Sequence, residues 1–400
     1  MNILIAVSDL SIGGAQRAAI NLANGIARLH PEHHVVLYDV EAYPPDEGMA
    51  ASISSEFAVF RPSLFRRLLD RLLASVLYRT ALNRRFAVRT SIRQRQRHFR
   101  RVLRKHRIDV INSHTWWADK FVREALGSMA IPHAVSMHGS YEEVLSNGYL
   151  KTSEESYMRK VLAKCSAVIY ASDKNLQVFD KLLIEKPGVC KKLYYVVELR
   201  KPDIPMVRND LQIERDAFTM CIASRAIESK GWDIAVETAL TLRERGHKVE
   251  LLLLGVGPSM VELQQRHADK KFLHFMGPVE HVEPYLAVCD CAIFPTTYRG
   301  ESLPNFVLES LFSSVPVVTT DIAEIPAMLT VNGKTAGVII PTDQSKESIA
   351  EQFIAEVQQL IMNPDRLARM KELARECAAR YSPEEAVDDN LRVFEKVTGA

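Results

Sequence analysis

Short apolar runs alternate with longer amphipathic stretches along most of the chain. In the first half the predicted strands are NILIAVS, HVVLYDV, IDVINSH, PHAVSMH, SAVIYAS and LYYVVEL, with GGAQRAAINLANGIARL and WADKFVREALGSM as helices. The second half restarts with AFTMCIAS, WDIAVETALTLRERG and KVELLLLGVG, followed by FLHFMG, CAIFPT, VPVVTT and GVIIP as further strands. Strands that alternate with helices are typical of parallel sheets covered on both faces. The sequence therefore predicts an α/β protein built from Rossmann-like domains.

The length and a linker signal divide the chain in two. Four hundred residues exceed what one hydrophobic core usually organises. A polar, proline-bearing segment from Arg200 to about Asp216 is the predicted linker. We expect an N-terminal domain over 1–200, a C-terminal domain over 201–380, and a helix in 381–400 that packs back on the first domain. Because ligands bind outside the carboxyl ends of such strands, two domains facing across a cleft favour an enzyme.

Charge is distributed unevenly between one block and the rest of the chain. The net charge is +2, but residues 61–107 hold fifteen Arg, Lys105 and one acid, so this insertion carries +15. Within it, 64–82 has apolar residues at helical spacing, flanked by Arg66, Arg67 and Arg71. A basic amphipathic helix can lie on an anionic membrane surface, which is the favoured interpretation. A packed or protein-binding face is the alternative; nucleic acid is disfavoured because no base-reading motif is visible.

Targeting and redox features point to the cytoplasm. The first residues, MNILIAVSD, show no basic n-region or cleavage site, and no apolar stretch approaches about 18 residues, so neither a secretory signal nor a membrane span is expected. The six cysteines are scattered, and Cys289 and Cys291 form only a C-x-C with no matching pair nearby. We expect buried thiols in a reducing compartment, with no disulfide and no metal.

The first chemical signal is the loop SIGGAQRAA, between the first strand and the first helix. Gly13 and Gly14 allow the backbone to approach a ligand, and the helix N-terminus offers free N–H groups to an anion. The spacing is not the G-x-G-x-x-G of dinucleotide-binding loops. A plain tight turn explains it equally well.

The second signal is SRAIESKG, directly after the first strand of the second domain. Arg225 and Lys230 lie five residues apart on a loop that opens a helix at Trp232. Two cations beside the carboxyl end of a strand suit a diphosphate, whose charge must be neutralised as it leaves. The alternative is a solvated loop with incidental basic residues.

The third signal is YRGESLPNFVLESL. Glu301 precedes a helix predicted to begin near Pro304, which suits the first helical position. Glu309 lies one and a half turns inside, so both carboxylates can point into one cleft while Leu308, Leu311 and Phe312 face the core. Glu309 could bind a ribose diol and Glu301 the sugar hydroxyls. The alternative is a surface helix with two acids.

With these motifs in place, the chain resembles the retaining family 4 glycosyltransferases of GT-B fold, also described as glycosyl transferases group 1. Glu, seven residues and Glu in ESLPNFVLES, followed by PVVTT, is similar to the family's donor signature. GGAQ resembles its first-loop motif, SMHG its domain-one histidine motif and SRAIESKG its Arg/Lys motif. LLLLGVGP, FMGPV and GVIIPTD extend the resemblance over nearly the whole chain.

The resemblance implies roles for individual residues. Gly14, Arg225 and Lys230 would bind the diphosphate, Glu309 the ribose and Glu301 the sugar. The backbone at Ser302, Leu303, Pro304 and Asn305 would close on sugar and phosphate, Val279 would meet the base, and His138 would lie against the transferred sugar. Acceptor-side candidates are Gln16, His114, Trp117, Tyr141 and Glu143. By itself a histidine after a strand is more often structural; the resemblance and its strand-end position favour the functional interpretation.

Three departures from the family pattern blur the identity of the donor. Ser302 stands where many relatives have glycine, Ala323-Glu324 replaces a Gly-Gly pair, and VVELRKPDIP replaces the interdomain N-G turn. They leave the expected fold and phosphate site in place.

These observations predict a metal-independent retaining glycosyltransferase that needs no cofactor. No Asp-x-Asp pair that could grip a divalent ion appears in the sequence. A UDP-sugar is the first expectation for the donor and a GDP-sugar the second. The expected acceptor is a membrane-associated glycan or glycolipid of bacterial surface polysaccharide or lipopolysaccharide synthesis, at the inner face of the cytoplasmic membrane. A GT-B-fold sugar-nucleotide epimerase or hydrolase, and a non-catalytic sugar-nucleotide-binding scaffold, remain alternatives.

Overall fold

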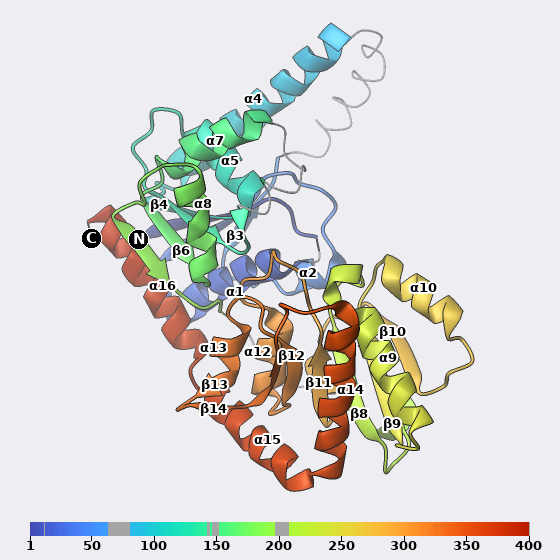
Figure 1. Cartoon of the computed structure of the whole chain (residues 1–400). Coiled ribbons are helices and arrows are strands. Elements are labelled where there is room, and N and C mark those ends of the chain that lie inside the picture. Colours follow the sequence, from blue (N-terminus) through green and yellow to red (C-terminus); the bar gives the residue numbers. More distant parts are fainter. Residues whose placement is uncertain (12, 63–80, 142–144, 146–151, 197–207, 400) are drawn as a thin grey trace. The chain divides into compact units, whose positions relative to one another are not determined.

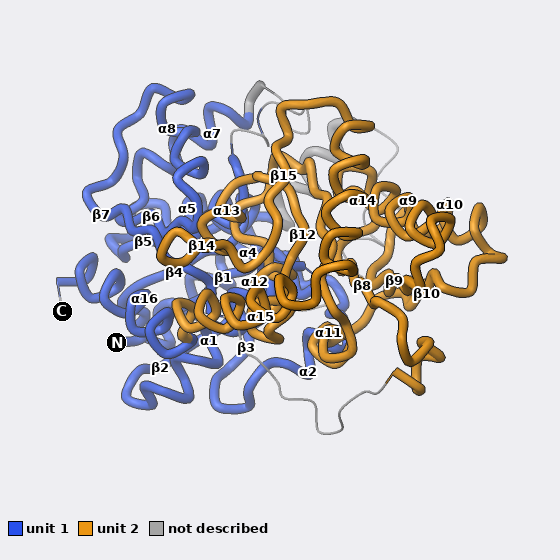
Figure 2. The backbone as a smooth tube through the Cα atoms, turned by 60° about the horizontal axis from the view of Figure 1, so that its bottom comes forward, with its two compact units in different colours: residues 1–196, 383–400 blue, residues 197–382 orange. Residues whose placement is uncertain are grey.

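The computed structural model describes the chain except for residues 12, 63–80, 142–144, 146–151, 197–207 and 400. The chain forms two compact units, which Figure 2 shows in different colours. Unit 1 comprises 1–196 and 383–400, and unit 2 comprises 197–382. Much of the predicted linker, and the amphipathic stretch 64–82 up to Thr80, lie outside the described residues.

Unit 1 is built on a seven-stranded parallel sheet in the order β3-β2-β1-β4-β5-β6-β7. Its strands are β1 (Asn2–Val7), β2 (His34–Asp39), β3 (Ala58–Phe60), β4 (Val110–His114), β5 (His133–Met137), β6 (Ala167–Tyr170) and β7 (Val189–Lys192). Its described helices are α1 (Gly14–Leu29), α2 (Glu47–Ala51), α4 (Ala81–Lys105), α5 (Trp116–Leu126), α7 (Thr152–Leu162), α8 (Gln177–Lys181) and α16 (Pro383–Thr398), with a 3-10 turn at Asp173–Leu176.

The apolar run of β1 is continuous because both faces of its strand are covered. Alternate residues of a strand point to opposite faces. Ile3 and Ile5 join a core with residues of α1 and α16, whereas Leu4 joins the opposite core with Phe99 of α4 and Phe121 of α5. Alternate side chains of this one apolar strand therefore contribute to two different cores, one on each face of the sheet.

Helix α16 returns from the end of the chain to lie beside α1 (Figure 1). A side chain at Gly25 would place its Cβ 2.6 Å from Cγ2 of Val387, so the glycine permits the close approach. Nε2 of His30 lies 2.7 Å from a carboxylate oxygen of Asp388, which ties the same two helices together. The last helix therefore belongs to the hydrophobic core of unit 1.

Unit 2 has a six-stranded parallel sheet in the order β10-β9-β8-β11-β12-β15. Its strands are β8 (Phe218–Ala223), β9 (Val249–Leu254), β10 (Leu273–Gly277), β11 (Cys291–Phe294), β12 (Val317–Thr320) and β15 (Gly337–Ile340), beside an antiparallel pair, β13 (Thr330–Val331) and β14 (Lys334–Thr335). Its helices are α9 (Trp232–Glu244), α10 (Pro258–Arg266), α11 (Glu283–Leu286), α12 (Asn305–Phe312), α13 (Ile325–Leu329), α14 (Lys346–Met362) and α15 (Pro364–Ala378), with 3-10 turns at Arg208–Leu211 and Glu228–Lys230.

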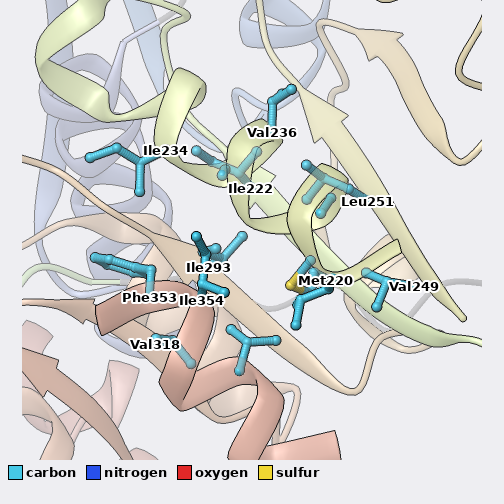
Figure 3. Close-up of a cluster of buried hydrophobic side chains, with 14 of the residues drawn as sticks. Met220, Ile222, Ile234, Val236, Val249, Leu251, Ile293, Val318, Phe353 and Ile354 are labelled. Carbon is cyan, nitrogen blue, oxygen red and sulfur yellow. The ribbon is translucent and has the colours of Figure 1, made fainter. Parts of the chain in front are cut away.

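One core of unit 2 lies between the sheet and helices α9 and α14 (Figure 3). Met220, Ile222 and Ile293 of the sheet are fully buried in it, together with Phe353 of α14. Burial of such side chains stabilises by about 1.5–3 kcal/mol each. This packing holds the strand ends, and the loops that follow them, in fixed positions.

The two parallel sheets confirm the predicted α/β class, while two details of the prediction were wrong. LYYVVEL was expected to be a strand, but β7 runs over Val189–Lys192, and Leu193 and Val196 instead pack into the core that includes α16. The edge strand β3 was missed because its three half-buried residues are too few to show alternation. None of the described helices is long and apolar enough to span a bilayer.

Candidate functional site

Three loops of unit 2 meet at the carboxyl edge of its sheet, after β8, β9 and β11. The backbone N–H of Ala226 donates to the carbonyl of Val256 at 2.9 Å, and that of Thr297 donates to the carbonyl of Ser229 at 2.8 Å. Gly231 has φ +72°, and a Cβ there would lie 2.2 Å from the carbonyl oxygen of Pro295. Only glycine allows this close approach without strain.

Lys230 and Glu301 form a buried ion pair within these loops. Nζ of Lys230 donates to Oε1 of Glu301, and Oγ1 of Thr296 lies 3.3 Å from the same oxygen. Nζ also lies 5.0 Å from the ring centroid of Tyr298. Both charged side chains are about nine-tenths buried. Such a pair is held by its geometry, because a buried charge left without its partner is costly.

Arg225 supplies an exposed cation beside this buried pair. Its guanidinium carbon lies 5.6 Å from the centroid of the Tyr298 ring, the same ring that Lys230 approaches. The structure thus brings Arg225, Lys230 and Glu301 together around Tyr298. An aromatic face stabilises nearby cations, and the exposed guanidinium can still bind an anion.

The segment after Glu301 is buried backbone that leads into α12. Ser302, Leu303 and Glu309 are each less than a tenth exposed. Pro304 was expected in the first helical position, but it has φ −70° and ψ 124°, so α12 begins at Asn305. Because this extended proline precedes the helix, the first N–H groups of α12 lie directly after the loop. Leu308 and Leu311 are buried as expected, whereas Phe312 is only partly buried. Val279 is half-buried after β10.

The corresponding edge of unit 1 holds a chain of neutral polar groups. Nδ1 of His114 lies 2.6 Å from Nε2 of His138, and Nε2 of His114 lies 2.7 Å from Oδ1 of Asn112. The His138 ring packs on Tyr195 with centroids 4.5 Å apart. Burial lowers the pKa of His138 to about 3 and lowers the pKa of His114 well below its usual value. Both imidazoles are therefore neutral near pH 7.

Tyr141 belongs to a second buried network beside this chain. Its hydroxyl donates to Asp119, which accepts another hydrogen bond from the hydroxyl of Ser113 at 2.5 Å. The Ser113 hydroxyl also lies 2.6 Å from Nε2 of His133. Burial raises the pKa of Asp119 to about 8, although the two hydrogen bonds lower it. Tyr141 thus fixes the start of the loop after β5. Glu143 lies outside the described residues.

The turn between β4 and α5 is strained. Thr115 has φ +80° and ψ 148°, a conformation that β-branched residues rarely adopt. It is followed by Trp116, which is buried, and by Trp117, which is 52% exposed. Nζ of Lys120 lies 5.8 Å from the centroid of the Trp117 ring.

The loop after β1 is covered by the Gln16 side chain. A Cβ at Gly13 would lie 2.3 Å from Oε1 of Gln16, and Nε2 of Gln16 lies 3.4 Å from Oδ1 of Asp9. Gly14 is the exposed first residue of α1. The backbone N–H of Ser11 donates to Asp9 at 2.9 Å. Asp9 orders this loop.

The basic block is described only in part. Arg66, Arg67 and Arg71 lie outside the described residues. From residue 92 onward, α4 exposes Arg93, Arg97 and Arg101, whereas its opposite face buries Phe99, Val102 and Leu103 in the core of unit 1. In this part of the helix the apolar face is therefore already occupied, and the arginines face solvent.

One cluster of possible metal ligands occurs among the described residues, away from these loops. His30, Glu32 and His33 place ligand atoms within 4.8 Å of one another. His30 already bonds both Glu32 and Asp388, so the cluster is explained by its contact with α16. The absence of a metal requirement stays a prediction.

Comparison with known families decides the class of this protein. The family described as Glycosyltransferase Family 4 matches residues 12–185, and the family described as Glycosyl transferases group 1 matches residues 217–362. The chain belongs to the group 1 and family 4 glycosyltransferases. Each family match falls within one of the two units, so His114 and His138 lie in the first matched region and Lys230 and Glu301 in the second.

Three glycosyltransferase relatives have similar sequences. D-inositol 3-phosphate glycosyltransferase 1 of Catenulispora acidiphila is 25% identical over 313 residues, 72% of each chain. The provisionally named teichuronic acid biosynthesis glycosyltransferase TuaC of Bacillus subtilis is 25% identical over 244 residues, 60% of this chain and 58% of that one. Uncharacterized glycosyltransferase MJ1059 of Methanocaldococcus jannaschii is 23% identical, and the match spans 38% of this chain and 39% of that relative.

Solved glycosyltransferases share the fold over the whole chain. HepE of Anabaena, solved in complex with UDP and glucose, has a TM-score of 0.73 at 15% identity and covers 99% of this chain and 100% of its own. WaaG, a glycosyltransferase involved in lipopolysaccharide biosynthesis, has a TM-score of 0.68 at 16% identity, with both chains covered completely. At sequence identities of 15% and 16%, the structural similarity establishes the fold alone.

The sequence-based search for a glycosyltransferase site missed several polar residues. Asn112 and Ser136 lie inside apolar strand segments, and Asp119 inside a predicted helix, so none of the three stands out when its own segment is considered alone. A signal was present in IDVINSH and PHAVSMH: polar residues recur at alternate positions toward the ends of two neighbouring parallel strands. Asp9 lies two residues after the end of β1 and could have been found as a strand-end carboxylate.

Proposed function

We propose that this glycosyltransferase moves a sugar from a UDP-sugar to a hydroxyl group of a membrane-associated glycan or glycolipid, with retention of anomeric configuration and without a metal ion. The observation that carries the donor site is the arrangement of Arg225, Lys230 and Glu301 around Tyr298, directly before the N-terminus of α12. A leaving diphosphate needs cations and N–H groups where its charge develops.

The chemistry proposed for each group follows from its position. Arg225 is exposed and would bind the diphosphate first, while Lys230 would exchange part of its contact with Glu301 for a phosphate oxygen. The carboxylate of Glu301 would then be free to accept hydrogen bonds from sugar hydroxyls, and the buried Glu309 would accept from the ribose. The acceptor hydroxyl oxygen attacks the anomeric carbon on the face from which the diphosphate departs, the electron pair of the broken C–O bond stays on the diphosphate, and the hydroxyl proton passes to a diphosphate oxygen.

The choice of UDP over GDP is supported by structural neighbours. HepE, which shares the fold, is solved with UDP, with UDP and glucose, and with UDP-glucose. The proposed involvement in surface polysaccharide or lipopolysaccharide synthesis is supported by the names of TuaC and WaaG.

A panel of UDP-, GDP- and ADP-sugars tests the donor. We expect a UDP-sugar to raise the melting temperature most, and the NMR spectrum of the transfer product to show the anomeric configuration of the donor. Turnover should survive excess EDTA. Inversion of configuration would contradict the retaining proposal, and loss of activity in EDTA with rescue by Mg²⁺ would contradict metal independence. Consumption of donor without any acceptor would favour an epimerase or hydrolase.

We separately propose that the protein docks peripherally on the inner face of the cytoplasmic membrane. Docking is supported by the +15 block and by the exposed row Arg93, Arg97 and Arg101. Residues four apart on a helix share one face. Each basic residue close to an anionic leaflet contributes about 1 kcal/mol, and salt weakens the attraction.

Vesicle sedimentation tests docking. The protein should sediment with phosphatidylglycerol vesicles at low salt and poorly with neutral vesicles. Reversal of Arg93, Arg97 and Arg101 to Glu should reduce sedimentation without changing UDP affinity. Reversal of three exposed lysines elsewhere, Lys164, Lys191 and Lys271, provides the matched control. Equal binding to neutral vesicles, or equal loss in the control, would contradict docking through α4.

A further inference from the structure

The hydrogen bonds that link the polar groups at the edge of the unit 1 sheet run in one direction. That direction is set by a first group that can only accept a hydrogen bond. The carbonyl oxygen of Ala134 lies 3.2 Å from Nδ2 of Asn112. A carbonyl accepts and never donates, so the amide nitrogen of Asn112 must face it. The same nitrogen donates to the hydroxyl of Ser136 at 2.9 Å. The orientation of the Asn112 amide is therefore fixed by the pairing of β4 with β5.

This orientation determines where the protons of the two imidazoles lie. Oδ1 of Asn112 accepts, so Nε2 of His114, 2.7 Å away, must carry the hydrogen. A neutral imidazole has one donor and one acceptor nitrogen, so Nδ1 of His114 accepts. Nε2 of His138, 2.6 Å from it, must then donate. The remaining nitrogen of His138, Nδ1, is left with a lone pair and no hydrogen.

Nδ1 of His138 is shielded from water and has no hydrogen-bond partner within the described part of the chain. The His138 ring cannot turn easily to find one, because Tyr195 packs against it with ring centroids 4.5 Å apart and His114 holds its Nε2 at 2.6 Å. A buried acceptor without a donor is unfavourable until a ligand supplies one. The nitrogen thus favours a ligand that carries an O–H or N–H group over one that presents a bare oxygen.

We propose that Asn112 and His114 are positioning residues that hold His138 in the Nε2–H tautomer, so that Nδ1 of His138 is a dedicated acceptor for a hydroxyl group of the substrate. A phosphate oxygen or a carbonyl, which brings only lone pairs, is repelled at this point. The tautomer follows from the contacts of unit 1 alone. The identification of the donor group as a sugar hydroxyl rests on the proposed function.

Nitrogen-15 NMR of protein with labelled histidine reads the tautomer directly, because protonated and unprotonated ring nitrogens resonate far apart. In the wild type we expect His138 and His114 each to carry the hydrogen on Nε2. Two variants separate ring shape from hydrogen bonding. His114→Phe keeps an aromatic ring against His138 but offers no acceptor, so the His138 hydrogen should distribute over both nitrogens. His114→Gln offers Oε1 to His138 and its amide nitrogen to Asn112, so it should restore the wild-type pattern.

The tautomer of His138 should also affect the affinity for the UDP-sugar but not the affinity for UDP. In His114→Phe, affinity for the accepted UDP-sugar should fall about threefold to tenfold, the loss expected for one neutral hydrogen bond, and His114→Gln should recover most of it. Affinity for UDP itself should not change, since UDP lacks the transferred sugar whose hydroxyl would meet Nδ1. His98→Phe, which removes an imidazole hydrogen-bonded to Tyr38 instead, is the matched control and should leave both affinities unchanged.

Each outcome decides one point. A hydrogen on Nδ1 of His138 in the wild type, or an unchanged His138 spectrum in His114→Phe, overturns the assignment of the tautomer. An equal loss of UDP and UDP-sugar affinity in His114→Phe overturns the hydroxyl acceptor and indicates a merely structural role. Should His114→Phe fail to fold, the wild-type spectrum is decisive by itself. Failure of the proposed function appears differently, as wild-type protein with the expected tautomer that binds no nucleotide sugar.

Discussion

The two units place different chemistry at the same place in a similar fold. At the carboxyl edge of the unit 2 sheet, Lys230 and Glu301 are charged, buried and paired, with the exposed Arg225 beside them. At the carboxyl edge of the unit 1 sheet, the buried His114 and the half-buried His138 are neutral and are joined by a hydrogen bond. The first arrangement suits a charged ligand, and the second suits an uncharged polar one.

The difference teaches that a parallel sheet determines where a site lies but not what it binds. In unit 2 the buried Lys230 and Glu301 are paired with each other, whereas burial in unit 1 removes charge by lowering histidine pKa values and raising that of Asp119. If the comparison is correct, changes in unit 2 should act on nucleotide binding, and changes in unit 1 on sugar, acceptor or stability.

Removal of the buried cation of unit 2 should have the largest effect. Lys230→Met leaves Glu301 buried without a partner, which costs about 3–5 kcal/mol of stability. It also removes the charged hydrogen bond proposed between Lys230 and phosphate, worth about 1.5–3 kcal/mol, so transfer should fall roughly 10- to 150-fold.

The double variant Lys230→Met/Glu301→Gln is the control for this change. It carries no unpaired buried charge, so most of the stability should return while transfer stays low. Thermal unfolding and steady-state turnover measure the two effects. Wild-type melting temperature and turnover in Lys230→Met would show that the pair is incidental.

The buried carboxyl of unit 1 should make stability depend on pH. The pKa of Asp119 is raised from 3.8 to about 8. The folded state therefore prefers protonated Asp119. The contribution of Asp119 to the stability of the fold is complete below pH 4 and is lost as the pH rises through 8. The loss is at most about 1.4 kcal/mol for each pH unit in this window. Asp119→Asn cannot titrate, so its melting temperature should gain on that of the wild type from pH 5 to pH 8. Parallel curves would contradict the raised pKa.

Alanine substitution of two glycines tests the contact between the loops after β8 and β11 of unit 2. Gly231 and Gly246 both have positive φ, +72° and +86°, but only at Gly231 would a Cβ meet another group, the Pro295 carbonyl. Gly246→Ala should cost about 1–2 kcal/mol from backbone strain alone. Gly231→Ala should cost more, because the loop after β11 must also move, and it should weaken UDP binding. Urea denaturation and calorimetry measure these effects; equal costs in the two variants would mean that the loops are not tightly joined.

The smallest effect is expected at Trp117. Its ring is 52% exposed, so Trp117→Ala should change stability by no more than about 0.5 kcal/mol. If the ring is part of the acceptor side, KM for acceptor should rise while UDP affinity is unchanged. A change in UDP affinity with no change in acceptor KM would contradict the placement of Trp117 on the acceptor side.

Sequence patterns predicted the fold well because burial on both faces makes parallel strands continuous apolar runs. AFTMCIAS and KVELLLLGVG contain β8 and β9 for this reason. LYYVVEL failed because its apolar residues are buried by α16, an element nearly two hundred residues away that local periodicity cannot register.

The site was less predictable from the sequence for a physical reason. Arg225, Lys230 and Glu301 occur in recognisable loops, but their meeting depends on the close contact of Gly231 with Pro295. Asn112 and Ser136 are 24 residues apart and become partners only through the register of β4 with β5, in which Asn112 faces Ala134. The direction of the histidine chain is thus a property of the sheet rather than of any motif.

The most direct test of the contrast between the two units is calorimetric titration with UDP. Three proteins are compared: the wild type, Arg225→Gln, which removes the exposed cation of unit 2, and His138→Gln, which removes the neutral imidazole of unit 1. We expect Arg225→Gln to weaken UDP binding by roughly 10- to 150-fold, the cost of one charged hydrogen bond, and His138→Gln to leave it within about twofold of the wild type. A large loss in His138→Gln together with unchanged binding in Arg225→Gln would contradict the assignment of the diphosphate to unit 2.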